Sequence, residues 1–261
     1  MSNPLFYRHG KLIPAAEIKK AIAAGADPDM NNRQALMNAI DHGTPAQVRT
    51  LLLCGATLPK DNKQDWFVRH AIRAGSPAKI DHLASAGLTM GMKFLDGTNG
   101  FHELSLMPLG VDPTPIAQRL LNAGASIHAR AYKESPNLHG REQGSKQPLH
   151  HMAEQGVDAG VIEQALRLGA DVNAQSFHGY TPLSLARNKE IAQVLLEGGA
   201  DLDIELHSGK TVAQHCYFPG AKDFIAGWQR QHSLQQVATA TRKELDLADP
   251  EELAERRGRF M

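Results

Sequence analysis

Short stretches of apolar residues at helical spacing alternate with glycine and polar turns along this chain. The clearest example begins with Leu149 and Met152, which fall on one face of a first helix. A second apolar stripe follows over residues 161–168. Gly156 and Gly169 come at the ends of these two stretches, where glycine tolerates the positive φ that closes a helix. The pattern predicts a unit of two short helices.

The end of the second helix carries a signature that returns along the chain. It reads Gly-Ala or a close variant, and its glycines lie at positions 25, 55, 87, 124, 169 and 199. These glycines are 30, 32, 37, 45 and 30 residues apart. A unit of about thirty residues with insertions is typical of a stacked repeat protein, in which each unit packs on its neighbours.

Two adjacent units carry motifs that identify the type of repeat. Pro148-Leu149-His150 and Thr181-Pro182-Leu183 begin the units, and they end in Leu168-Gly169-Ala170-Asp171-Val172-Asn173 and in Leu195-Leu196-Glu197-Gly198-Gly199-Ala200-Asp201. The sequence resembles ankyrin repeats over about residues 12–218, with degraded motifs outside these two units. The resemblance implies an all-α ankyrin-repeat solenoid of about six full or partial helix-turn-helix repeats with β-turn fingers.

We expect two regions, an ankyrin repeat domain over residues 1–221 and a helical C-terminal cap or extension over residues 222–261. Residues 14–27 supply only a second helix and would cap the N-terminal end of the stack. A long insertion over residues 129–146 explains the step of 45 residues. The Ser233-x-x-Gln236 pattern of a capping box predicts that a new helix starts there and runs to about Leu245. A last helix is predicted from Asp249.

Composition limits the classes of partner and the cellular compartments to be considered. Lys and Arg together number 28, and so do Asp and Glu, so no net positive charge favours nucleic acid. We find no secretion signal and no run of eighteen apolar residues, so we expect no membrane span. Cys54 and Cys216 lie in different repeats, which argues against a disulfide. These features predict a soluble cytoplasmic protein that is monomeric alone, although specialised secretion systems often leave no such mark.

The search for catalytic chemistry mostly returns negatives. The chain lacks a phosphate-binding Gly-x-x-x-x-Gly-Lys-Ser/Thr loop, a His-Glu-x-x-His pair and a Cys-x-x-Cys pair. Thirteen histidines, above all His139, His150 and His151, suggest a metal site. However, His150 stands where the repeat pattern uses a histidine to hydrogen-bond the turn between repeats. Cys54 and Cys216 are both interpreted as small core residues and residues 96–100 as a turn, so we predict no catalytic residue, cofactor or metal.

Exposed positions on the concave face and the fingers are the predicted contacts with a protein partner. Two interpretations of Phe177 and Tyr180 stay open at this point, partner contact or packing on a neighbouring finger. Two interpretations of the insertion at residues 129–146 also stay open, a loop that contacts the partner or a solvated loop. The candidate residues are Phe177, His178, Tyr180, Glu205, His207 and Lys210 in the fingers; Asp41, His42, Arg73, Glu154, Gln155 and Asn188 on the helices; and Tyr132, Leu138 and Arg141 in the insertion.

A non-catalytic protein-binding module is the predicted function. One hypothesis is an inhibitor of the immunity or antitoxin kind, because irregular repeats and a specialised long finger suit one dedicated partner. A second is a secreted effector or adaptor that captures a host protein. A third is an enzyme with its catalytic residues in the atypical segments 88–112 or 222–261.

Overall fold

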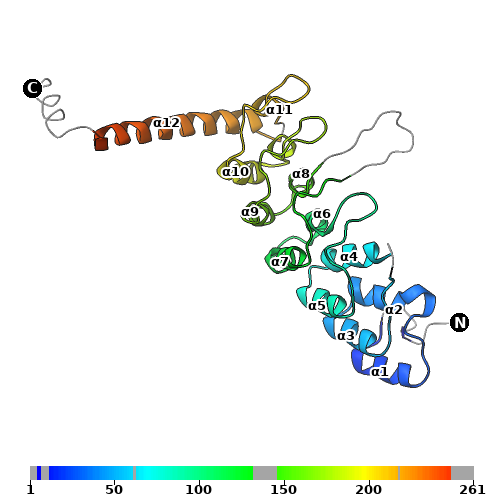
Figure 1. Ribbon diagram of the computed structural model, residues 1–261. Coiled ribbons are helices and arrows are strands. Elements are labelled where there is room, and N and C mark those ends of the chain that lie inside the picture. The colour runs from blue at the N-terminus through cyan, green and yellow to red at the C-terminus, as the bar shows by residue number, and fades with distance from the viewer. Residues whose placement is uncertain (1–4, 7–11, 61–62, 132–145, 217, 248–261) are drawn as a thin grey trace, which may run out of the picture.

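The computed structural model arranges the chain as an elongated stack of short helices in two rows (Figure 1). It describes residues 5–6, 12–60, 63–131, 146–216 and 218–247. One row contains α2, α4, α6, α8 and α11, and the other contains α1, α3, α5, α7, α9 and α10 (Figure 1). We call them the inner and the outer row. The two-row stack is the all-α repeat solenoid that the sequence predicts.

In most units a tight turn joins one helix of the inner row to one helix of the outer row, and in the 181–199 unit a single 3-10 turn takes the inner place. The helices are α1 (Ala15–Ala23), α2 (Met30–Asp41), α3 (Pro45–Leu53), α4 (Gln64–Arg73), α5 (Pro77–Ser85), α6 (Gly100–Glu103) with η1 (Leu104–Leu106), α7 (Thr114–Asn122), α8 (Pro148–Gln155), α9 (Ala159–Arg167), η2 (Leu183–Leu185), α10 (Lys189–Glu197), α11 (Val212–His215) and α12 (Ala221–Leu247). As expected, α1 lies in the outer row at the N-terminal end, and the described residues before it, 5–6 and 12–14, form no helix (Figure 1).

Local sequence explains where these helices begin and end. Thr44 starts α3 with a capping box, because its hydroxyl accepts from the Gln47 N–H while the Gln47 side chain binds the Thr44 N–H. Gly156 ends α8 with φ +72°, in the left-handed conformation that glycine adopts at low cost. The short, well-capped helices follow from this repeated local chemistry.

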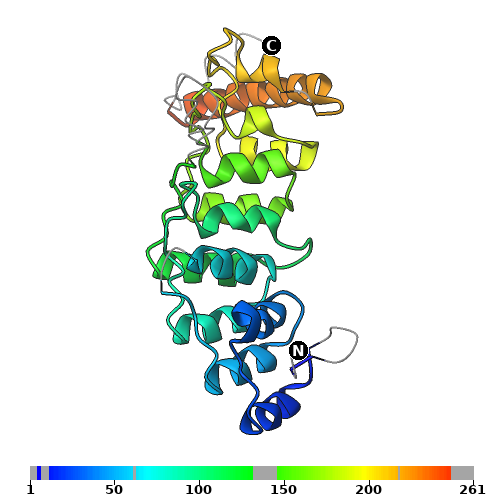
Figure 2. The same ribbon diagram turned by 90° about the vertical axis from the view of Figure 1, so that its right-hand side faces the viewer.

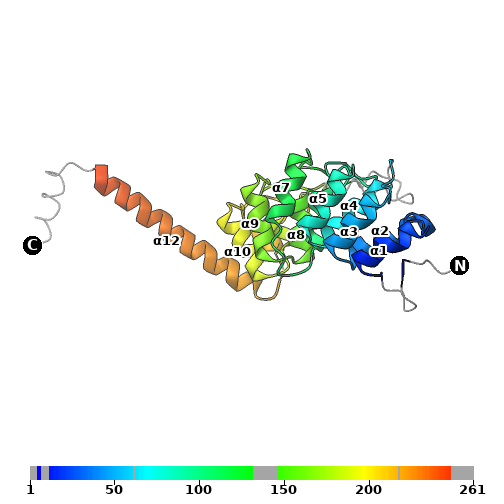
Figure 3. The same ribbon diagram turned by 90° about the horizontal axis from the view of Figure 1, so that it is seen from below.

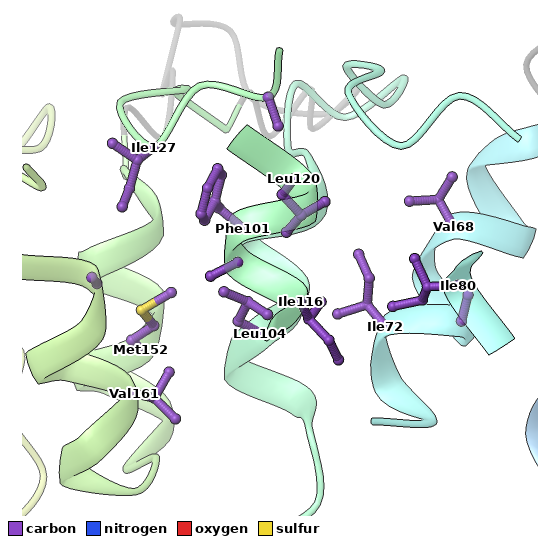
Figure 4. Packing of buried hydrophobic residues seen from close by; sticks show 14 of the residues in the cluster. Val68, Ile72, Ile80, Phe101, Leu104, Ile116, Leu120, Ile127, Met152 and Val161 are labelled. Carbon is purple, nitrogen blue, oxygen red and sulfur yellow. The ribbon is translucent and has the colours of Figure 1, made fainter. Parts of the chain in front are cut away.

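A continuous apolar core runs along the stack between the two rows. Figure 4 shows Ile72 of α4, Phe101 of α6, Leu120 of α7 and Met152 of α8 in one file of buried side chains. Phe101 is fully buried. Because each helix contributes a few apolar side chains to the spaces on both sides, no single unit encloses a core by itself.

The fingers project from one side of the stack, along the loops that lead into the inner helices (Figure 2). Residues 93–99 and 205–211 are each closed by an isolated antiparallel β-bridge, Lys93 with Asn99 and Glu205 with Thr211. Within the described ranges, backbone pairing of the strand type is confined to such isolated bridges. The fingers are therefore turns rather than sheet.

The inner element of the 181–199 unit is shorter than its sequence suggests. We expected Thr181-Pro182 to open a helix, but only the single 3-10 turn η2 forms. Thr181 and Gly199 are 18 positions apart, whereas Gln147 and Gly169 in the preceding unit are 22 apart. The missing four residues amount to about one helical turn. The best-matched motif thus begins the most reduced inner element.

The C-terminal helix corrects a second expectation. α12 is one continuous helix, so the predicted start of a new helix at Ser233 is wrong. The Ser233 hydroxyl instead donates to the Gln229 carbonyl one turn back, at 2.8 Å. Ile225 is buried near the start of α12, and Phe224 and Trp228 pack against the core. The C-terminal part of the helix extends beyond the stack (Figure 3). The helix predicted from Asp249 lies outside the described residues.

No helix in the described part of the chain has both the length and the apolar character needed to cross a bilayer. Both cysteines are free thiols, and Cys216 is buried. Burial raises the pKa of the Cys216 thiol to about 11, and the thiol donates to the Leu183 carbonyl at 3.4 Å. Cys216 is the core residue that the sequence predicts, whereas Cys54, also expected in the core, lies half-buried in the turn after α3.

Candidate functional site

The two C-terminal fingers, residues 176–180 and 205–211, form one hydrogen-bonded platform. In the first, the Ser176 N–H donates to the Tyr180 carbonyl at 2.9 Å. The second is closed by a bond of 2.8 Å from the Leu206 N–H to the Lys210 carbonyl. Between the fingers, the His207 N–H donates to the His178 carbonyl at 3.3 Å. Six predicted contact residues are thereby brought together.

Gly179 sets the spacing between these fingers. It has φ +75°, and a Cβ at this position would lie 2.9 Å from the backbone nitrogen of His207. Only glycine combines this backbone conformation with such a close approach of the next finger. The neighbouring backbones therefore fix the platform, so its main chain needs little ordering on binding.

The aromatic side chains of the first finger divide between the two interpretations left open by the sequence. Phe177 is 47% exposed, and its ring lies edge-on to His178 with centroids 5.2 Å apart. Tyr180 is half-buried, packs against the core and lies 5.0 Å from the ring of His215 in the following unit. Phe177 and His178 are thus available at the surface, whereas Tyr180 also has a structural role.

Buried histidines fix the inner helices to the fingers. The Gln147 N–H donates to Nδ1 of His150 at 3.2 Å, so Nε2 carries the proton and donates to the Tyr180 carbonyl at 3.0 Å. Burial lowers the pKa of His150 to about 4. The expectation that His150 bonds the turn between repeats is confirmed, and with it a structural role for this histidine.

His102 has the same role one unit earlier, which the sequence analysis missed. The Asn99 N–H donates to its Nδ1 at 3.1 Å, and its Nε2 lies 3.4 Å from the Lys146 carbonyl. Burial lowers the pKa of His102 to about 3. The role of His102 could have been predicted by aligning the two units. In that alignment Asn99-Gly100-Phe101-His102 occupies the position of Gln147-Pro148-Leu149-His150.

The predicted helix positions lie at the ends of inner helices away from the fingers. Asp41 and Arg73 end α2 and α4, and each has a partner within the protein. The Asp41 carboxylate binds Nδ1 of His70 at 2.6 Å, and Nε of Arg73 donates to Glu103 at 2.7 Å. These contacts leave both side chains half-exposed.

The remaining helix positions differ in exposure. His42, just after α2, and Gln155, at the end of α8, are exposed. The Lys146 ammonium pairs with the half-exposed Glu154 at 2.7 Å. Asn188 lies on no inner helix: it caps α10 by accepting from the Ile191 N–H at 2.8 Å. The first-helix position assumed for Asn188 is wrong because the inner element of that unit ends at η2.

A charged network joins the inner helices α4 and α6 to the 93–99 finger. Glu103 is buried, with 3% of its side chain exposed, and Nη1 of Arg69 donates to it at 2.5 Å. Arg69 also binds Asp96 at 2.8 Å and Asp65. The Arg69 guanidinium lies 4.2 Å from the centre of the Phe94 ring. The network fixes the finger against the helices in the same way as the histidines do further along.

Comparisons with known proteins agree with this geometry. A model of the ankyrin repeat family matches residues 178–205, which run from within the first finger through η2 and α10 to the start of the second finger. The solved ankyrin repeat domain of Bcl-3, described as a unique member of the IkappaB protein family, superposes with a TM-score of 0.56 at 22% identity. That match covers 81% of this chain and 91% of the solved one. The fold is that of an ankyrin-repeat stack, and residues 178–205 carry an ankyrin repeat.

A curated relative matches over a shorter stretch. The ADP-ribosylation factor GTPase-activating protein AGD2 of Arabidopsis thaliana is 38% identical over 76 residues. That stretch is 28% of this chain and 10% of AGD2. The likeness thus concerns a small part of AGD2. Ankyrin repeats form protein–protein interaction modules, so the surface of this ankyrin stack is where a partner is to be sought.

The ankyrin stack also places side chains that the sequence analysis did not select. Leu95, at the tip of the 93–99 finger, is 78% exposed. Trp66, in the first turn of α4, is half-buried and stacks on His70 with ring centroids 3.7 Å apart. Two features of the sequence could have drawn attention to these residues: Leu95 is an apolar residue in a turn, and Trp66 is a tryptophan, a rare residue in this chain. The predicted contacts Tyr132, Leu138 and Arg141 lie outside the described residues.

Among the described residues, no three His, Cys, Asp or Glu side chains are grouped to hold a metal ion. In the 88–112 segment, the carboxylates of Asp96 and Glu103 bind Arg69. The loop at residues 96–100 is a turn, as predicted, with Gly97 at φ +76° and a bond from its N–H to the Phe94 carbonyl. The charged and polar side chains of the 88–112 segment therefore hold the 93–99 finger against the inner helices.

Proposed function

We propose that this chain is a non-catalytic binding protein that recognises one protein partner through its fingers and inner helices. The platform formed by residues 176–180 and 205–211 is the observation that carries the proposal. It combines an exposed Phe177, the histidines His178 and His207 and the charged Glu205 and Lys210 on a backbone fixed by hydrogen bonds. Aromatic side chains held in a preformed surface are typical centres of binding energy.

The proposal includes inhibition of the partner by occlusion. A stack that presents fingers and inner helices on one side can cover a substrate site on a bound protein without any chemistry of its own. Equal numbers of basic and acidic residues support a protein rather than a nucleic-acid partner. Titrating the chain against the captured partner would test inhibition through the partner's own activity.

We further propose that the chain is a monomer when alone and resides in the cytoplasm. The large exposed apolar side chains are distributed over several elements, among them Leu53 on α3, Leu95 on a finger and Leu109 before α7. This distribution supports a monomer, since stable self-association requires one contiguous patch. The two free thiols support a reducing compartment.

Capture from the native source tests the proposal. The full chain serves as bait beside the double variant Phe177→Ala, His178→Ala, whose side chains are exposed, so the fold is retained. Leu53→Ala on the outer row is the matched control, because Leu53 is 76% exposed. We expect mass spectrometry to identify one protein that the wild type and Leu53→Ala capture equally and that the finger variant captures about tenfold less. Equal capture by all three baits would remove the platform from the interface.

A further inference from the structure

A groove on the inner row near the N-terminal end is built from α2, α4 and the loop that joins α3 to α4. It consists of two adjoining hollows of 470 and 390 Å³, whose shared walls include Met37 and Trp66. Pro59 and Phe67 also line the first hollow. The middle of the groove is therefore apolar and of a size that suits a large side chain.

The Trp66 wall is held in place before anything binds. Its ring stacks on the His70 ring at 3.7 Å with 20° between the planes. The Asp41 carboxylate fixes that imidazole at 2.6 Å, and Phe67 meets Trp66 edge-on at 5.1 Å. A wall already ordered in the free protein loses little conformational freedom on binding. Trp66 thus has the properties of a preformed contact surface.

One end of the groove is positively charged. Three cationic side chains, Arg33, Lys63 and Arg69, line the first hollow with one carboxylate, Asp65. Asp65 binds Arg69, which also binds Asp96 and Glu103. In the described part of the chain no carboxylate lies within ion-pair distance of Arg33, so the positive charge at this end is that of Arg33. Arg33 is linked to the Asp29 carboxylate through the Thr57 hydroxyl, which accepts from Nε of Arg33 at 3.3 Å and donates to Asp29 at 2.5 Å.

The backbone at Arg33 places that charge on the groove wall. Asn31, Asn32 and Arg33 have φ of +54°, +56° and +65°, a left-handed turn that asparagine tolerates better than arginine. Nε of Arg33 donates to the Thr57 carbonyl at 2.9 Å, which holds the side chain across the turn. At the other end, the amide side chains of Asn31, Gln34 and Asn38 line the second hollow beside Asp41 and His42. The Asn31 amide donates to Oε1 of Gln34 at 3.4 Å, and the remaining amide groups can pair with a peptide backbone.

We propose that this groove receives an extended segment of the partner protein, with a large apolar side chain against Trp66 and an acidic residue beside Arg33. The apolar middle of the groove would contact the large side chain of the segment, and the positive end would pair with its carboxylate. The amide end would hydrogen-bond its backbone. The inference rests on the proposed binding function, and it assigns a second contact region at the opposite end of the stack from the C-terminal fingers.

Random peptides displayed on phage and selected on the full chain test the proposal. We expect the selected peptides to share an aromatic or leucine anchor next to Asp or Glu. A synthetic consensus peptide, measured by fluorescence anisotropy, should bind Trp66→Ala more than about tenfold more weakly than wild type. Trp228→Ala, which removes the other tryptophan of the chain, is the matched control and should bind as wild type does.

A second variant, which reverses the charge of Arg33, tests the groove even if Trp66→Ala folds poorly. Arg33→Glu should weaken the consensus peptide by about tenfold, and a peptide with Lys in place of its acidic residue should regain affinity for that variant. Peptides that lose binding only with Phe177→Ala, His178→Ala would overturn the groove while the finger platform stands. The groove is also overturned by a selection without a consensus, or by a dimer in sedimentation that Trp66→Ala dissociates.

Discussion

Glu103 shows how single side chains stabilise the inner row. Its carboxylate is buried and accepts from Arg69 at 2.5 Å and from Arg73 at 2.7 Å. A buried carboxylate is stable only when cations compensate it, and the two arginines come from the neighbouring helix α4. The interaction therefore couples two units of the stack, and Arg73, selected from the sequence as a contact residue, first serves the fold.

Glu103→Ala tests this role. Removing the buried carboxylate takes away two charge-assisted hydrogen bonds, while Arg73, with 38% of its side chain exposed, keeps access to solvent, so we expect the free energy of unfolding to fall by about 2 kcal/mol. Urea unfolding followed by circular dichroism measures the change. Glu163→Ala is the control, since Glu163 pairs with Arg167 on the exposed surface of α9 at 3.2 Å and should cost less than about 1 kcal/mol. Equal losses in the two variants would contradict the account.

At the scale of elements, histidines connect two of the inner helices, α6 and α8, to the loops that lead into the next inner elements. His102 bonds the Lys146 carbonyl before α8, and His150 bonds the Tyr180 carbonyl before η2. Both imidazoles are neutral in the folded state because burial lowers the pKa from the ordinary 6.5 to about 3 and about 4. The unfolded chain takes up protons at these histidines more readily than the folded chain does.

Stability should therefore fall as the pH decreases from about 6.5 toward 4.5. In this window the unfolded state binds more protons, so each histidine contributes a slope of up to about 1.4 kcal/mol per pH unit. Thermal unfolding between these pH values measures the slope, which His150→Gln should reduce. His128→Gln, at an exposed position, should leave it unchanged. A flat profile for the wild type would contradict the buried, neutral histidines.

Comparison of elements shows which parts of the fold local sequence can predict. The Gly-Ala signature and the Pro148-Leu149-His150 motif predict the units because each has a local cause, a left-handed helix end or a capped helix start. Ser233 misled because a capping-box pattern does not reveal whether the preceding residues are already helical. The shortened η2 could be predicted only by counting residues between motifs.

Part of the candidate site could also be predicted from the sequence, namely the finger residues, whereas the groove could not. Phe177 and His178 follow from the position of the finger within the repeat, and the structure leaves both exposed. The groove at Trp66 could not be predicted in this way, because it depends on how Arg33 of one unit and Trp66 of the next lie across a left-handed turn. Surfaces formed between units require the packing of the units to be known.

For the whole molecule, the central claim is that one side of the stack is a binding surface. Fingers and inner helices form that side, while α3, α5, α7, α9 and α10 form the other row (Figure 1). Hydrogen bonds between fingers, ion pairs between helices and a continuous core make the surface rigid. A partner held there should protect that side and leave the outer row unchanged.

Hydrogen–deuterium exchange of the full chain, with and without the captured partner, tests this claim most directly. Backbone amides report on each finger and helix separately, so no substitution is needed. We expect slower exchange on binding over residues 175–180 and 204–211 and in the first turns of α4, with no change in α3, α5 or α9. Protection confined to those outer helices or to α12 would contradict the account.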